Sequence, residues 1–242
     1  MYDQEQIKKH IEYYAKKLHL PVIPCNEKIP KLQGWQKRNK APTSEEIETW
    51  LESYHEMNIG LVLGQASGLI GIDVDGEKAK ELLKEWSDGD LPETWTYRTA
   101  SGGLRLLYRA PEGILLKKVV QTLDGEHNEL ALMGEGQQTI LPPSVYKGNP
   151  YRWMKNRNPA KQKIADAPQW MVDRMLGKIG TLNKTTSKPP KKKALEEEVV
   201  LKRLEGQCLS FKQAWKQQQQ KGISEEDWRS EEHTSELQSP VT

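Results

Sequence analysis

The sequence has few of the features that mark several common protein classes. Its two cysteines, Cys25 and Cys208, lie far apart and outside any CxxC or His/Cys cluster, so neither a disulfide framework nor a zinc site is predicted and a reducing interior fits best. The formal net charge is only +2, so any nucleic-acid surface is expected to be a local patch. No Gly-x-x-x-x-Gly-Lys-Ser/Thr loop is present, so the chain is not expected to be an ATP-driven helicase itself.

Long apolar runs are also missing. The most apolar stretch, Ile59 to Val74, is interrupted by glycines and polar residues and is too short to span a bilayer. The polar residues at 1–5 lack the apolar core of a signal peptide. We therefore expect a soluble, cytoplasmic protein with no membrane contact. Apolar residues make up 36% of 242 residues, which suffices for one sizeable core if part of the chain stays unpacked.

The remaining pattern predicts helices and strands in alternation. Apolar residues at helical spacing, a Thr43–Glu46 capping box and Pro168 as a first helical residue predict helices at 4–18, 43–51, 77–86 and 168–175. Short apolar runs around glycine turns predict strand pairs at 58–63 with 69–74, 95–99 with 104–108, and 129–133 with 138–141. The expected fold is α/β (α+β), with a central mixed or antiparallel sheet flanked by helices.

The composition divides the chain near residue 178. Residues 1–178 are expected to form one domain, and 179–194 a basic linker rich in proline and lysine. Residues 195–228 are typical of the start of a truncated helical region. Residues 229–242 resemble the translation of a sequencing adapter, so we exclude them from the fold and expect the natural protein to continue past Trp228.

Two aspartates provide the strongest chemical signal. Asp73 and Asp75 are two residues apart at the end of an apolar strand, so their carboxylates share one face. Paired like charges beside a core favour a compensating hard divalent cation, and two such ions can support phosphoryl chemistry. The alternative is a solvated turn in which Asp75 and Gly76 are ordinary turn residues.

A glycine turn and a further acid follow. In Ser101-Gly102-Gly103-Leu104-Arg105, the glycines and the Ser101 hydroxyl suit a phosphate, and the Arg105 guanidinium matches phosphate oxygens; the alternative is a plain hairpin. Glu129, at the mouth of an apolar strand, is the candidate third metal ligand, or else a solvated strand end. Pro142-Pro143-Ser144 ends the next strand as a rigid corner.

The ordered set of motifs resembles a known family. The set comprises Asn58-Ile59-Gly60, Gly64-Gln65-Ala66-Ser67-Gly68, Asp73-Val74-Asp75, Ser101-Gly102-Gly103-Leu104-Arg105, Glu129, Pro142-Pro143-Ser144 and Gly148-Asn149-Pro150-Tyr151-Arg152-Trp153. Over roughly residues 4–175 the chain is similar to the bifunctional DNA primase/polymerase N-terminal domain, the prim-pol branch of the archaeo-eukaryotic primase superfamily.

The resemblance implies template-directed nucleotidyl transfer from nucleoside triphosphates on a single-stranded DNA template. It implies that Asp73, Asp75 and Glu129 bind Mg²⁺ or Mn²⁺ and that Ser101, Gly102, Gly103 and Arg105 hold the triphosphate. Such proteins occur in phages, plasmids and integrated elements. They are often fused to a replicative helicase or encoded near one.

The chain departs from the family pattern at two positions. Arg105 replaces the usual histidine, which favours an alternative, a degenerate replication-initiation module that binds DNA or nucleotide without catalysis. Counted back from Pro142, the usual third acid falls at Ala131, so Glu126 and Glu135 remain alternatives to Glu129. A metal-dependent nuclease is a further alternative, since it needs acids too.

Two other basic segments suggest weak contact with nucleic acid. Trp35, Lys37, Arg38 and Lys40 form a small aromatic and basic cluster that suits a template strand or is a simple surface loop. Lys188 to Lys193 is a basic run typical of a solvated linker, with some salt-sensitive attraction to DNA.

Overall fold

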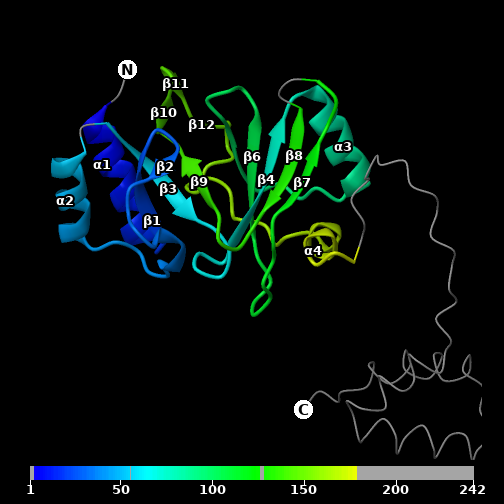
Figure 1. Cartoon of the computed structure of the whole chain (residues 1–242), viewed down its shortest axis with the longest axis horizontal. Coiled ribbons are helices and arrows are strands. Elements are labelled where there is room, and N and C mark those ends of the chain that lie inside the picture. Colours follow the sequence, from blue (N-terminus) through cyan, green and yellow to red (C-terminus); the bar gives the residue numbers. More distant parts are fainter. Residues whose placement is uncertain (1–2, 55, 126–127, 179–242) are drawn as a thin grey trace, which may run out of the picture. The chain divides into compact units, whose positions relative to one another are not determined.

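The computed structural model describes residues 3–54, 56–125 and 128–178. They form a mixture of helices and antiparallel strands, so the predicted fold class is confirmed (Figure 1). The predicted linker at 179–194, helical region at 195–228 and tail at 229–242 lie outside the described residues.

The helices and helical turns begin and end close to the predicted positions. They are α1 (Gln4–Glu12), the π-helical turn η1 (Tyr13–Lys17), the 3₁₀ turn η2 (Trp35–Lys37), α2 (Ser44–Ser53), α3 (Glu77–Ser87) and α4 (Gln169–Met175). The capping box before α2 is confirmed, since the Thr43 hydroxyl accepts from the Glu46 N–H and the Glu46 carboxylate accepts from the Thr43 N–H. No helix within the described residues has the length and apolar content needed to cross a bilayer.

The strands form two larger sheets and a small hairpin, and every pairing is antiparallel. The four-stranded sheet has the order β2 (Ile29–Pro30), β1 (Val22–Asn26), β3 (Met57–Val62), β9 (Gln138–Leu141). The six-stranded sheet has the order β12 (Arg152–Trp153), β5 (Trp95–Arg98), β6 (Leu104–Arg109), β4 (Leu69–Asp75), β8 (Glu129–Met133), β7 (Val119–Thr122). The hairpin pairs β10 (Val145–Tyr146) with β11 (Asn149–Pro150).

Two of the three predicted strand pairs are wrong. The β5–β6 hairpin is confirmed, but β3 and β4 belong to different sheets and are joined only by an isolated bridge between Gly64 and Leu69. The strands β8 and β9 are likewise divided between the sheets. Each of these strands is buried on both faces, so the sequence pattern shows that it is a strand without showing which strand is its partner.

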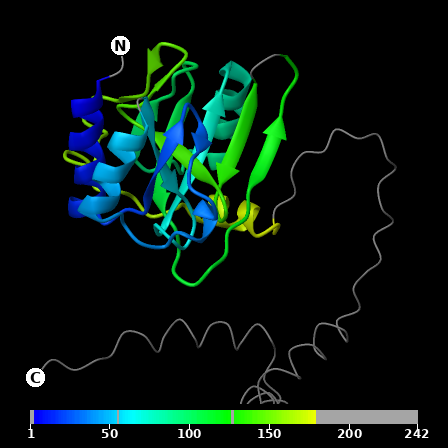
Figure 2. The ribbon, with the colours of Figure 1, turned by 60° about the vertical axis from the view of Figure 1, so that its left-hand side comes forward.

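Two apolar cores lie on opposite faces of the six-stranded sheet. One face, with Ile70, Ile72 and Val74 of β4, packs against α3 and α4. The other face contributes residues such as Tyr97 and Leu107 to a core shared with the four-stranded sheet, α1 and α2. Figures 1 and 2 show α1 and α2 side by side at the outer end of this arrangement. Because side chains alternate along β4, Asp73 and Asp75 lie on the face that looks toward the four-stranded sheet.

Candidate active site

The two aspartates of the acidic motif lie at the C-terminal end of β4. The four residues of β4 before Asp73 and the intervening Val74 are all buried, whereas both aspartates are partly exposed. The side chain of Asp73 is 30% exposed. The strand therefore leaves its core at this point and presents two carboxylates on one face to an accessible edge.

Arg105 pairs with the first of these aspartates. It lies directly opposite Asp73 on the neighbouring strand β6, and its Nη2 is 2.7 Å from Asp73 Oδ2. The Arg105 side chain is only 11% exposed, so the ion pair is largely withdrawn from water. A guanidinium fixed on a carboxylate in such a setting is a strong, directional contact.

A second layer of polar groups holds the arginine in place. Arg105 Nη1 donates to Thr139 Oγ1 and lies near Met133 Sδ, both at 2.7 Å. The Thr139 hydroxyl is 2.9 Å from the hydroxyl of Tyr97, which is fully buried. Burial raises the pKa of the Tyr97 phenol, partly opposed by the positive charge of Arg105. The Thr139 hydroxyl, which contacts the neutral Tyr97 phenol, thus helps to hold the guanidinium in position.

Glu129 is adjacent to the second aspartate. It lies directly opposite Asp75 on β8, on the same face of the sheet. Neither Asp75 nor Glu129 forms an ion pair within the described part of the chain. Like charges directly opposite each other destabilise a sheet unless a cation compensates them. The pair is therefore a place where a cation would relieve repulsion.

The alternatives for the third acid are now reduced. Ala131 is the residue opposite Asp73, so the strand position of the usual acid is apolar here. The Glu135 carboxylate accepts a hydrogen bond from the Gln65 N–H at 2.8 Å, beside the turn that precedes β4, at the opposite end of β4 from Asp73 and Asp75. The structure therefore does not bring Glu135 together with the two aspartates. Glu126 lies outside the described residues.

The glycine hairpin between β5 and β6 lies against Asp75. A side chain on Gly103 would place its Cβ 2.7 Å from the Val74 carbonyl oxygen and 3.2 Å from Asp75 Oδ1, so only glycine fits. Gly102 has φ +95°, which also favours glycine. The exposed Ser101 has its hydroxyl 3.1 Å from that of Thr99. The hairpin thus brings an exposed backbone turn and a hydroxyl beside the carboxylates.

The carboxylates of Asp73, Asp75 and Glu129 are the candidate donors for a divalent cation. Within the described residues, no three acidic, histidine or cysteine side chains gather closely enough to form a complete metal cage. Mg²⁺, however, is commonly held by one or two carboxylates, with waters and substrate phosphates completing its shell. Asp75 beside Glu129, with Asp73 one strand step away, fits a cation of that kind. Asp73 shares its charge with Arg105.

Sequence reasoning missed the groups that hold Arg105. Thr139 and Tyr97 are buried residues of strands that read as ordinary core segments, and no spacing connects them to Arg105. Their role depends on β9 of one sheet facing β5 and β6 of the other. Alternation along β6 puts Arg105 and Leu107 on one face, but the sequence does not show what lies opposite them.

Two other motifs turn out to be partners in a buried corner. The Asn58 side chain donates to the carbonyl oxygens of Glu27 and Val145 and accepts from the Val145 N–H at 3.0 Å. The Ser144 hydroxyl, fully buried, accepts from the Ile59 N–H at 2.9 Å. The Tyr14 hydroxyl donates to the Pro142 carbonyl oxygen at 2.6 Å. The corner predicted at Pro142–Ser144 therefore connects the end of β9 to β3 and to the turn η1.

The fold and the motif set together define a domain of the nucleotidyl-transfer class. The family model of the bifunctional DNA primase/polymerase N-terminal domain, Prim-Pol, matches residues 11–170 of the chain. That match covers more than half of the 242 residues, and the chain belongs to this family. A comparison with curated protein sequences finds no significant match.

Proposed function

We propose that the chain catalyses metal-dependent, template-directed nucleotidyl transfer from nucleoside triphosphates on single-stranded DNA. Family membership supports primase/polymerase chemistry in general terms. One observation supports the finer proposal. At one accessible strand end, Arg105 pairs with Asp73 and Gly103 lies against Asp75.

In this proposal Asp73, Asp75 and Glu129 would hold Mg²⁺ or Mn²⁺. Such a cation, when bound, would help a 3′-hydroxyl to attack and a pyrophosphate to leave. The chain's own residues do the positioning. The exposed backbone at Ser101 and Gly102 lies where a triphosphate can approach the carboxylates, and Gly103 keeps that approach free of a side chain.

Arg105 supplies the positive charge for the phosphates. Its Nε is buried and has no hydrogen-bond partner among the described residues, although its other nitrogens are all engaged. Buried donors in native proteins are normally satisfied, so a donor left over beside a charged site is consistent with a guanidinium that shifts when a ligand arrives. The contact of Nη2 with Asp73 is then the resting arrangement of the arginine.

One observation favours a second candidate, a non-catalytic module that binds nucleotide or DNA. The Arg105 guanidinium, 2.7 Å from Asp73, already compensates the charge of a carboxylate that the first candidate assigns to a metal. If that pair never opens, only Asp75 and Glu129 are left for a cation. Nucleotide binding without incorporation is the expected property of such a site.

Incorporation of a labelled nucleotide on a primed single-stranded template, with Mg²⁺ or Mn²⁺, decides between the candidates. Asp73→Asn is expected to abolish incorporation in a protein that stays folded at the assay temperature, with a lower unfolding temperature because the buried Arg105 loses its partner. The matched control is Asp166→Asn, which removes an exposed aspartate paired with Arg109 at the other end of the same sheet. Wild-type protein that binds triphosphate but incorporates none supports the second candidate. Degradation of the template without triphosphate would instead show a nuclease.

A further inference from the structure

A groove separate from the acids lies between the first helix and the segment after β12. It has a volume of about 190 Å³ and is lined by Lys9, His10, Tyr13, Tyr14, Trp153, Asn158, Pro159 and Ala160. The lining is therefore mostly aromatic or apolar, with basic groups at its edge. The polar tips of the deeper rings are engaged, because Trp153 Nε1 donates to the Tyr14 hydroxyl at 3.1 Å. The groove consequently offers ring surface rather than free hydrogen-bonding groups.

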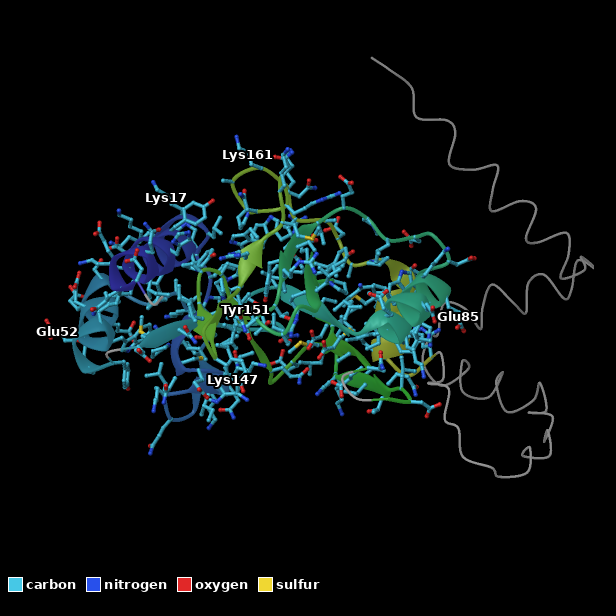
Figure 3. All side chains as sticks on the ribbon, turned by 90° about the horizontal axis from the view of Figure 1, so that it is seen from above. Lys17, Glu52, Glu85, Lys147, Tyr151 and Lys161 are labelled. Atoms are coloured by element: carbon cyan, nitrogen blue, oxygen red, sulfur yellow. The ribbon has the colours of Figure 1, made fainter. Side chains whose placement is uncertain are left out.

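The segment that contributes Trp153, Asn158, Pro159 and Ala160 to this groove is strongly basic. Five of the twelve residues from Arg152 to Lys163 are lysine or arginine, and none is acidic. Lys155, Lys161 and Lys163 are exposed and form no ion pair within the described part of the chain. Figure 3 shows Lys17 and Lys161 pointing outward on the same side of the ribbon. The whole chain carries a net charge of only +2, so this is a local concentration of charge.

The groove is connected to the acids by a direct row across the sheet. Trp153 is the cross-strand neighbour of Tyr97, Tyr97 of Arg105, and Arg105 of Asp73. The Trp153 and Tyr97 rings meet edge to face with centroids 5.1 Å apart. Three strand spacings separate Trp153 from Asp73, which is about 14 Å at 4.7–4.9 Å each. A polymer lying in the groove would thus be within a few residues of the acids.

We propose that this groove binds single-stranded nucleic acid, with a base stacked on Tyr13 or Trp153 and phosphates on the lysines of residues 155–163. Stacking on aromatic faces beside a basic track is how proteins bind single strands without reading sequence. A π-helical turn, here the segment that carries Tyr13, also occurs frequently at functional sites. The inference deepens the proposed function by giving the template a location, and it rests on that function for the template's role.

Binding of a fluorescein-labelled single-stranded oligothymidylate, followed by anisotropy with the full chain in EDTA and without triphosphate, tests the groove alone. The variant Lys161→Glu with Lys163→Glu is expected to lower the affinity at least ten-fold and to reduce the slope of log affinity against log salt by about two. The matched control, Lys117→Glu with Lys118→Glu, reverses two exposed lysines before β7 and is expected to change the affinity less than three-fold. Equal losses in the two variants would overturn the proposal.

The stacking surface has its own pair of variants. Tyr13→Leu keeps an apolar side chain but removes the ring, and is expected to weaken binding about ten-fold, whereas Tyr13→Phe keeps the affinity. Thermal unfolding checks that both are folded. Equal affinity of Tyr13→Leu and Tyr13→Phe would remove the stacking part of the proposal. Competition by poly-L-glutamate as strong as that by oligothymidylate would show a general anion surface instead.

The test separates this inference from the proposed catalysis. Asp73→Asn is expected to bind oligothymidylate like the wild type, because the acids are not part of the groove. Binding that depends on Lys161 and Tyr13 in a protein without incorporation would support the groove and contradict the catalytic proposal. Normal incorporation and unchanged affinity in a protein that lacks the side chains of Lys161 and Tyr13 would contradict the groove and support the catalytic proposal.

Discussion

The buried corner at Asn58 and Ser144 and the acid-bearing end of β4 both contain motif residues, but their polar groups are arranged in opposite ways. In the corner, the polar atoms of these two side chains meet backbone partners away from water. At the strand end, Asp75 faces Glu129 with no ion pair within the described residues. The first arrangement stabilises the fold, and the second places two like charges opposite each other at the position where we propose that a cation binds.

The comparison teaches that membership of a motif does not tell what a residue does. Asn58 and Ser144 are buried and hold the fold together, whereas their neighbours in the motif set include the residues that we propose for catalysis. A substitution in either region is expected to abolish activity in a simple assay. Stability and activity must therefore be measured separately, and the two regions should then give opposite results.

The largest expected effect is on activity at the strand end. Asp75→Asn keeps the shape of the side chain but removes a cation ligand, so incorporation is expected to fall about 1000-fold, equivalent to about 4 kcal/mol. The free energy of unfolding should stay the same or rise by less than about 1 kcal/mol, because repulsion with Glu129 is removed. Urea unfolding beside single-nucleotide incorporation checks both. A large loss of stability would show that Asp75 belongs with the corner.

The next effect is on stability in the corner. Asn58→Ala leaves the Val145 N–H and two carbonyl oxygens without their partner in a buried place, so the free energy of unfolding is expected to fall by about 3 kcal/mol. Below its unfolding temperature the variant should retain most of its activity per folded molecule. A folded Asn58→Ala protein with no activity would show that Asn58 is needed for activity and not only for stability.

Alkaline pH probes the two regions together, since Tyr14 belongs to the corner and Tyr97 supports Arg105. Burial raises the pKa of both phenols. A raised folded-state pKa stabilises the fold fully below the unfolded value near 10, and this contribution is lost as pH rises through the folded value. Each phenol should lower stability by about 1.4 kcal/mol per pH unit above about pH 10.

Urea unfolding at several alkaline pH values measures that slope. Tyr14→Phe is expected to be less stable at neutral pH, because it loses the hydrogen bond to Pro142, yet to lose stability less steeply above about pH 10. Identical slopes for Tyr14→Phe and the wild type would show that Tyr14 ionises freely in the folded protein.

A smaller effect concerns substrate affinity. Arg105→Gln removes the charge that the proposal assigns to the triphosphate, so KM for the nucleoside triphosphate is expected to rise about ten-fold. Arg105→His tests the residue usual in the family. A double-mutant cycle with Asp73→Asn separates the ion pair from the contact with substrate. An unchanged KM in Arg105→Gln would show that Arg105 does not bind the triphosphate.

How far the sequence predicted this structure depends on the range of the contacts. The capping box at Thr43, the hairpin at Gly102 and the shared face of Asp73 and Asp75 follow from spacings of a few residues, and all are present. The assignment of β3 and β4 to different sheets depends on partners far along the chain. The same holds for Thr139 behind Arg105, since a threonine in an apolar strand carries no sign of what faces it.

The smallest expected effect is at the other basic cluster, around Trp35 and Arg38. Arg38 is already engaged, with both terminal nitrogens on the Glu46 carboxylate at 3.0 and 2.7 Å and its guanidinium over the Trp50 ring. Its hydrogen bonds to the carboxylate hold the pKa of Glu46 below the usual value, a contribution present at neutral pH and lost as acid protonates Glu46.

Arg38→Gln is therefore expected to lower the free energy of unfolding by about 0.5 kcal/mol, a value typical of a partly exposed ion pair. Its affinity for oligothymidylate should stay within two-fold of the wild type, in contrast to the variant with Lys161→Glu and Lys163→Glu. Urea unfolding and anisotropy measure the two quantities on the same protein. A ten-fold loss of DNA affinity in Arg38→Gln, with the lysine variant unaffected, would move the template from the groove at Trp153 to the surface at Trp35.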